Sequence, residues 1–80
     1  MDALVDRDID RQEAERTLAG PEFVVPDDPS REVVMRRYLD RSLGREMLLR
    51  IVVEDTQFER VVVTLYKTSR LDKYLKGLLP

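Results

Sequence analysis

Two runs of aliphatic residues, separated by only five positions, constrain the fold of this chain more than any other feature. Residues 47–54 read MLLRIVVE and residues 60–67 read RVVVTLYK. Runs of aliphatic and β-branched residues favour strands, and the DTQFE segment between them is short enough for a hairpin connection. We therefore expect these runs to be the central strands of a small antiparallel sheet.

The N-terminal part of the chain predicts one helix that covers this sheet. We expect it at about residues 11–19, because Asp10 can cap its first turn and Glu13 follows at the spacing of a capping box. Gly20 is expected to end the helix in the left-handed conformation, and Pro21 blocks its continuation.

The remaining segments predict further strands and a short final helix. We expect an extended segment at 23–25, a first main strand at 31–39 and a helix at about 70–76. Ser69 and Asp72 have capping-box spacing at the start of that helix, and Gly77 should end it. The predicted fold class is α+β, in a single domain over residues 1–80. An N-terminal helix packs on a three- to four-stranded antiparallel β meander, and a short C-terminal helix follows.

Strand alternation assigns side chains to the two faces of the sheet if the connections are the simplest hairpins. In that register Arg50 lies opposite Thr64, and Arg36 lies beside Arg50 on the neighbouring strand. One face is then almost wholly apolar and should receive the N-terminal helix, with Met35, Leu49, Ile51, Val53, Val61, Val63 and Leu65. The other face carries Arg36, Tyr38, Arg50, Thr64 and Tyr66 above Val34, Val52 and Val62.

The residue types that are missing restrict the chemistry of the chain. It has no cysteine and no histidine, so we expect no disulfide, no metal ion and no cofactor. No apolar run approaches the roughly 20 residues that cross a bilayer, and the acidic N-terminus is unlike a signal peptide, which predicts a cytoplasmic protein without membrane contact. Residues 1–30 carry nine acids and three bases, whereas residues 31–80 carry seven acids and eleven bases. The strand-bearing part is therefore basic.

Arginine in the middle of a central strand is costly to bury without a partner. Arg36 and Arg50 would repel each other side by side, and a phosphate group, which guanidinium binds in bidentate fashion, would relieve that repulsion. The alternative is a solvated face on which neighbouring glutamates neutralise both charges. A basic strip after the last strand could add phosphate contacts or simply face solvent. It consists of Lys67, Arg70, Lys73 and Lys76.

Several segments together resemble a known family. They are the DRDID motif at residues 6–10, the segments at 13–21, 31–37 and 48–54, and, most specifically, VVVTLYKTSR at 61–70. The pattern extends from about Arg7 to Tyr74. It resembles the small bacterial proteins of domain-of-unknown-function family 4258. These are similar to RelE-like toxins of toxin–antitoxin systems, in the barnase–EndoU–colicin–RelE class of nuclease folds.

The resemblance implies a ribonuclease or RNA-binding module with a basic site on the sheet and no need for a metal ion. By position, the implied catalytic residues are Arg50, Thr64, Arg70 and Tyr74. The implied substrate-binding residues are Arg36, Arg50, Lys67, Arg70 and Lys73. Relatives usually begin with an upstream strand and a helix that carries a histidine, and we expect this chain to lack both elements.

A second hypothesis, of a different class, is a catalytically inactive interaction domain. The predicted N-terminal helix offers little apolar area, chiefly Ala14 and Leu18, for so apolar a sheet face. Exposed apolar patches often bind other proteins. The expected partner is RNA on the first hypothesis, and an antitoxin-like protein or a second copy of the chain on the other.

Overall fold

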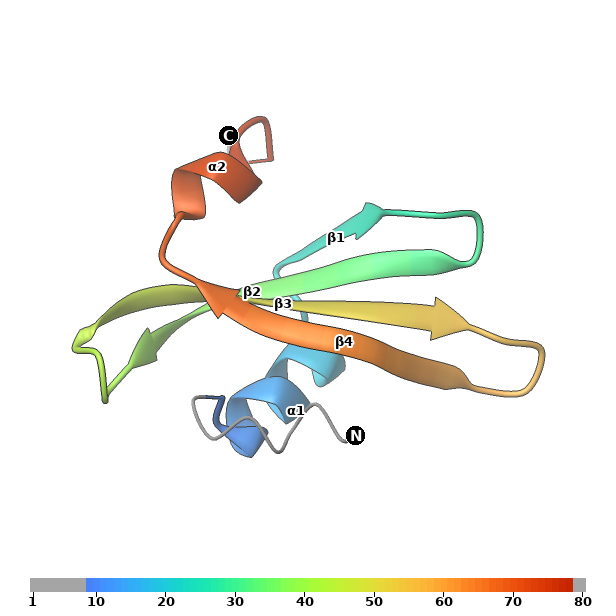
Figure 1. The fold of residues 1–80 in the computed structure, drawn as a ribbon, viewed down its shortest axis with the longest axis horizontal. Coiled ribbons are helices and arrows are strands. Elements are labelled where there is room, and N and C mark those ends of the chain that lie inside the picture. The colour runs from blue at the N-terminus through green and yellow to red at the C-terminus, as the bar shows by residue number, and fades with distance from the viewer. Residues whose placement is uncertain (1–8, 79–80) are drawn as a thin grey trace.

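Four consecutive antiparallel strands form the centre of the structure, a computed structural model that describes residues 9–78 (Figure 1). The elements are α1 (Arg11–Ala19), β1 (Phe23–Pro26), β2 (Arg31–Asp40), β3 (Arg45–Asp55), β4 (Arg60–Thr68) and α2 (Leu71–Leu75). The strand order is β1-β2-β3-β4, so each strand pairs with its neighbour in the sequence. The predicted α+β class, with a helix before the meander and a short helix after it, is confirmed.

The helix α1 has the predicted bounds but ends differently. Asp10 caps it, since its Oδ1 atom accepts a hydrogen bond of 2.8 Å from the backbone N–H of Gln12. Glu13 does not complete the capping box and binds two arginine side chains instead. Gly20 has a φ of −151°, so the predicted left-handed conformation was wrong. The cause is Pro21, because a proline favours extended backbone in the residue before it, and the chain continues directly toward β1.

The turn between β2 and β3 sets a register one residue away from the predicted one. Asp40 pairs with Arg45 across a four-residue turn. Gly44, with a φ of 65°, supplies the left-handed position of that turn. The Oδ1 atom of Asp40 also accepts a hydrogen bond of 3.0 Å from the N–H of Leu43. Because turn length sets the register, a one-residue difference exchanges the faces of a whole strand.

The change of register separates the two arginines that the sequence placed side by side. Arg36 pairs with Leu49, and Arg50 pairs with Met35. The prediction that Arg36 and Arg50 are neighbours on one face was therefore wrong. The residues of β2 that lie on the face opposite to the predicted one are Val34, Met35, Arg36 and Tyr38.

The register between β3 and β4 also differs from the prediction. Arg50 pairs with Tyr66 instead of Thr64, and Thr64 pairs with Val52. An irregularity between the pairs of Val52 and Val53, together with a four-residue turn at the tip, produces the shift. Around Arg50 the shift amounts to two residues, which preserves the face. Arg50, Thr64 and Tyr66 therefore share a face, as predicted.

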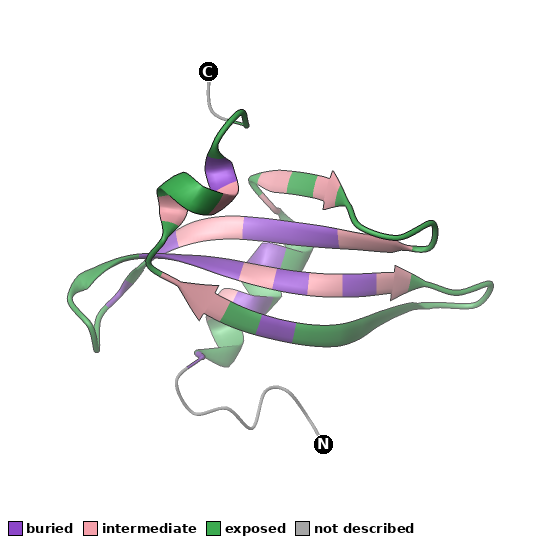
Figure 2. Ribbon diagram, turned by 45° about the horizontal axis from the view of Figure 1, so that its top comes forward, coloured by how far each residue is buried: buried purple, intermediate pink, exposed green. Residues whose placement is uncertain are grey.

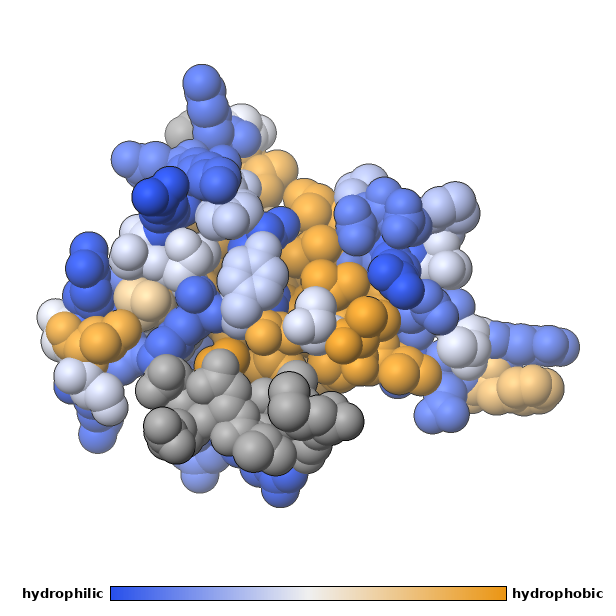
Figure 3. Space-filling view, in the orientation of Figure 1, coloured by the Kyte–Doolittle hydropathy of each residue, from blue (hydrophilic) through white to orange (hydrophobic). Residues whose placement is uncertain are grey.

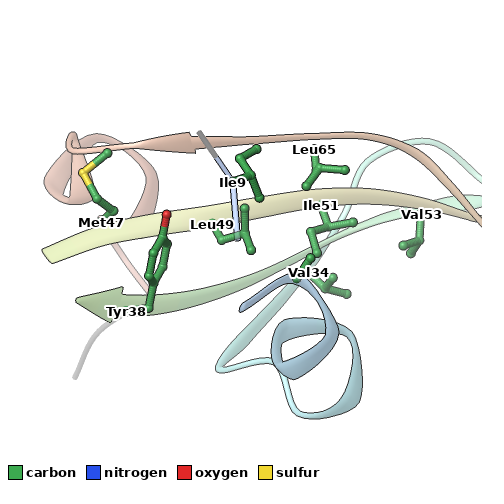
Figure 4. Close-up of a cluster of buried hydrophobic side chains, with 9 residues drawn as sticks. Ile9, Val34, Tyr38, Met47, Leu49, Ile51, Val53 and Leu65 are labelled. Atoms are coloured by element: carbon green, nitrogen blue, oxygen red, sulfur yellow. The ribbon is translucent and has the colours of Figure 1, made fainter. Parts of the chain in front are cut away.

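The helix α1 and Ile9 cover one face of the sheet (Figures 2 and 4). Ala14 and Thr17 are the buried residues of α1, whereas Leu18, predicted for its apolar face, is 38% exposed. Much of the face that the sequence analysis expected to be open to a partner is thus covered within the chain. The cluster consists of Ile9, Ala14, Val34, Tyr38, Met47, Leu49, Ile51, Val53 and Leu65.

The helix α2 covers one end of the opposite face. Leu75 is only 1% exposed and packs on Val33, Met35 and Leu48. Its start has no side-chain cap, so the capping box predicted there is absent. Gly77, with a φ of 83°, follows the helix as expected. Among residues 9–78, no helix is long and apolar enough to cross a membrane.

Candidate nucleic-acid interface

Arg50 lies against two tyrosine rings on the α2 side of the sheet. Its Cζ atom is 4.0 Å from the ring centroid of Tyr74 and 5.5 Å from that of Tyr66. One guanidinium nitrogen, Nη1, donates a hydrogen bond to the hydroxyl of Tyr66, and Nε donates to the sulfur of Met35 at 3.3 Å. We call Arg50, Tyr66, Tyr74 and the neighbouring Lys73 the Arg50 site.

Three elements bring this site together. Arg50 belongs to the central strand β3, and Tyr66 is its cross-strand partner on β4. Tyr74 comes from α2, which is held on the sheet by the buried side chain of Leu75. The two tyrosine rings meet edge to face, with centroids 6.5 Å apart and planes inclined by 66°. A cation held against aromatic faces is stabilised without a counter-charge.

Arg50 differs from most arginines of the sheet in having no acidic partner. Within residues 9–78, no carboxylate lies within ion-pair distance of its guanidinium group. Four other strand arginines each form an ion pair of 2.7 to 2.9 Å. These pairs are Arg31 with Glu54, Arg36 with Glu13, Arg37 with Glu22, and Arg60 with Glu32. Within residues 9–78, no glutamate or aspartate therefore neutralises the positive charge of Arg50 by an ion pair.

Further positive charge surrounds the site. The Nζ atom of Lys73 lies 5.2 Å from the ring centroid of Tyr74. Arg70 is exposed at the start of α2. In the part of the chain that the structure describes, neither Lys73 nor Arg70 has an ion-pair partner. The three cations and two aromatic rings make this end of the sheet attractive to an anion that also carries a flat ring.

The two tyrosines of the site have opposite pKa shifts. A hydrogen bond from the Tyr66 hydroxyl, together with the charges of Lys73 and Arg50, lowers the pKa of Tyr74 below the usual 10.0. Burial raises the pKa of Tyr66, and its hydrogen bond to Tyr74 adds to that rise, although Arg50 opposes it. The hydroxyl of Tyr74 is therefore easier to ionise than that of Tyr66.

Two residues predicted to bind substrate lie on the α1 side instead. Arg36 forms an ion pair of 2.8 Å with Glu13 of α1. Lys67 forms one of 2.8 Å with Asp40, and their side chains are only 15% and 8% exposed. The hydrogen bond from Lys67 lowers the pKa of the Asp40 carboxyl, so that carboxyl is ionised at neutral pH. These contacts satisfy both cations within the chain.

The other predicted site residues share the α2 side. Arg50, Tyr74, Lys73 and Arg70 lie in or beside the Arg50 site, and Thr64 precedes Tyr66 by two positions on the same face. The sequence prediction did not include Tyr66 among the site residues, although it placed Tyr66 on the same face as Arg50. The signal that was present is an arginine and a tyrosine on adjacent strands, which stack across a sheet when the register allows it.

A hollow on the α1 side offers a contrasting arrangement of charge. Its volume is about 460 Å³, and the residues that line it include Glu13, Arg16, Tyr38 and Asp40. Glu13 there binds both Arg16 and Arg36, and Asp40 binds Lys67 and accepts a hydrogen bond of 3.3 Å from Tyr38. Its acids and bases largely neutralise one another, so the Arg50 site is the stronger candidate for an anionic ligand.

Neither a metal-binding group nor a similar known protein indicates a function for the part of the chain that the structure describes. Within residues 9–78, no group of three or more acidic side chains could hold a metal ion. No family model, curated protein or solved structure matches this chain. The geometry of the Arg50 site is therefore the main indication of what the chain binds.

Proposed function

We propose that the Arg50 site binds single-stranded RNA, in a RelE-like domain related to toxin–antitoxin systems. The observation that carries the proposal is Arg50 itself, which lies against two tyrosine rings with no carboxylate beside it in the described chain. Proteins bind single-stranded nucleic acid by combining cations for the phosphates with aromatic rings on which bases stack.

The bound RNA would use different atoms of the site for its different parts. Arg50 directs Nη1 to Tyr66 and Nε to Met35, which leaves Nη2 to donate to a phosphate oxygen. Tyr66 is 38% exposed, so its ring can contact a base. Lys73, which lies beside Tyr74, and Arg70, at the start of α2, would contact neighbouring phosphates.

Cleavage of the bound RNA is a second step that the same residues suit. Once ionised, the oxygen of Tyr74, whose pKa is lowered, would take the proton of a 2′-hydroxyl group as the 2′-oxygen attacks the adjacent phosphorus. The bond to the 5′-oxygen breaks, and that oxygen takes a proton from Lys73 or from water. Arg50 would stabilise the charge that develops on the phosphate oxygens, and Thr64 would orient the reacting group. No histidine is required.

The test is the affinity for a labelled single-stranded oligoribonucleotide, measured by fluorescence anisotropy at low salt. Replacing Arg50→Ala removes a charge-assisted contact of about 1.5–3 kcal/mol, which corresponds to a roughly 10- to 150-fold weaker affinity. Arg45→Ala is the matched control, because it removes the same charge from the same strand on the α1 side. It should change the affinity less than about threefold, since surface charges contribute little individually.

A second substitution separates charge from geometry. Arg50→Lys keeps the charge but loses the planar guanidinium, so its affinity should lie between those of the wild type and Arg50→Ala. The same samples, shown to be folded by circular dichroism, are incubated with RNA to measure cleavage. An equal loss in Arg45→Ala and Arg50→Ala, or no RNA binding by the wild type, would refute the proposal.

A protein-interaction domain is the second candidate function. The exposed valines Val61, Val62 and Val63 of β4 favour it.

A further inference from the structure

The strand β4 presents an aliphatic edge to solvent. Val61, Val62 and Val63 are 40%, 39% and 42% exposed, and Figure 3 shows apolar surface over this part of β4. Among the described residues, β4 pairs only with β3, so its outer backbone groups have no strand partner there. No charged residue interrupts the strand between Arg60 and Lys67. A long edge strand of this kind is a template for pairing with another strand.

The opposite edge of the sheet is much less suited to pairing. The edge strand β1 has only four residues, whereas β4 has nine. β1 ends at Pro26, which has no N–H group to donate. Val24 on β1 is nevertheless 49% exposed, which makes it a useful control position.

The charges at the two ends of β4 favour a second copy of the same strand. Glu59 precedes β4 and Arg70 follows it, and within residues 9–78 neither forms an ion pair. Antiparallel pairing of two copies brings the start of one strand to the end of the other, so Glu59 of each copy approaches Arg70 of its partner. Arg60 and Lys67 also approach each other, but Glu32, Asp55 and Asp40 already neutralise them.

We infer that two copies of this chain pair through β4 in antiparallel fashion. Their four-stranded sheets join into one continuous sheet, and the valine-rich start of each β4 packs against the end of its partner's β4. One nine-residue strand buries less surface than the about 800 Å² per partner of a standard interface, so the dimer should depend on concentration. This interface lies beyond the proposed RNA function and would stand without it.

The first experiment is sedimentation velocity on the full chain from about 10 μM to about 1 mM, a range that brackets weak association. The wild type should pass from monomer to dimer. Val63→Lys puts a charge into the middle of the edge and should weaken dimerisation at least about tenfold. Val24→Lys makes the same change on β1 and should leave the dimer unchanged. Circular dichroism melts show whether each variant is folded.

Exchanging the end charges tests the partner's identity without touching the core. Glu59→Arg and Arg70→Glu should each weaken the dimer, and the double variant should restore it, because the two charges meet across the interface. Failure of the double variant to restore dimerisation would overturn the inference. So would a chain that stays monomeric at every concentration, or a dimer that Val24→Lys disrupts and Val63→Lys does not.

Hydrogen exchange distinguishes a second copy from another occupant of the same edge. In a dimer, the outward N–H groups of β4 gain protection as the concentration rises. If those groups are protected equally at all concentrations in a monomer, a segment of the same chain, such as residues 1–8, occupies the edge. That result would contradict the inference, while the RNA-binding proposal would be unaffected.

Discussion

Replacing Leu75 with alanine should destabilise the protein and also impair the Arg50 site. Leu75 is 1% exposed and fixes α2 on Val33, Met35 and Leu48. Tyr74, its neighbour in α2, is the ring that lies closest to Arg50. Because α2 has only five residues, it cannot remain helical without this packing. The substitution therefore acts on stability and on the site together.

The size of the effect follows from the burial of Leu75. The change from leucine to alanine removes three carbon atoms, at about 0.8 kcal/mol each, or about 2.4 kcal/mol before any cavity term. A domain of this length has a free energy of unfolding of about 4–12 kcal/mol, so it should remain folded at room temperature. The loss corresponds to a fall in Tm of about 10–20 °C.

Thermal melts followed by circular dichroism, together with RNA anisotropy below the lowered Tm, measure both effects. RNA affinity should fall roughly fivefold or more, because Tyr74 no longer lies over Arg50. Leu39→Ala makes the same chemical change at a position that is 66% exposed, and should alter neither quantity appreciably. If Leu75→Ala has the Tm and the RNA affinity of the wild type, the packing of Leu75 does not hold Tyr74 of α2 against Arg50 as the mechanism requires.

Two pH-dependent predictions follow from the ionisable groups. In an absorbance titration of the phenol groups, Tyr74 should ionise below pH 10.0 and Tyr66 above it. The substitution Tyr74→Phe should remove the ionisation step at the lower pH. A lower step that persists in this variant would contradict its assignment to Tyr74. Asp40 has a folded-state pKa below 3.8, so its carboxylate contributes stability that is present above pH 3.8 and is lost as the pH falls through the folded-state pKa. Asp40→Asn should therefore flatten the acid limb of urea unfolding midpoints, and a limb as steep as that of the wild type would show that the Lys67 contact contributes nothing.

The elements of the fold could be predicted from the sequence because each has a strong local signal. The aliphatic runs around Ile51 and Val62 define the central hairpin, and Asp10 marks the start of α1. The final helix follows from the spacing of its apolar residues, of which Leu75 is the most deeply buried. Each of these patterns spans only a few neighbouring residues, so it can be recognised in the sequence without knowledge of the tertiary structure.

The strand registers could not be predicted from the sequence, because they depend on the exact length of each turn and on an irregularity within a strand. A four-residue turn after Asp40 puts Arg36 on the α1 side, where a turn one residue longer or shorter would put it beside Arg50. The irregularity next to Val52 has no sequence signature, and it brings Tyr66 to Arg50. The structure consequently brings Arg50 and the α2 residues together as expected, but it surrounds them with other strand residues than those predicted.

The pairing of distant charges was also invisible in the sequence. Lys67 belonged to an apparent basic strip, yet Asp40, 27 positions away, binds it on the α1 side. Glu13 reaches Arg36 across 23 positions in the same way. Only the folded structure shows which basic side chains form an ion pair with an acidic one and which, like Arg50, form none within residues 9–78.

The most direct test of the account is an NMR titration of the full chain with a short single-stranded RNA, observing arginine Nε and tyrosine ring signals. The account predicts shifts at Arg50, Tyr66 and Tyr74 that saturate together, while the Nε signal of Arg36 on the opposite face stays unchanged. Saturating shifts around Arg36 and Lys67, or no shifts at all with a folded protein, would contradict it.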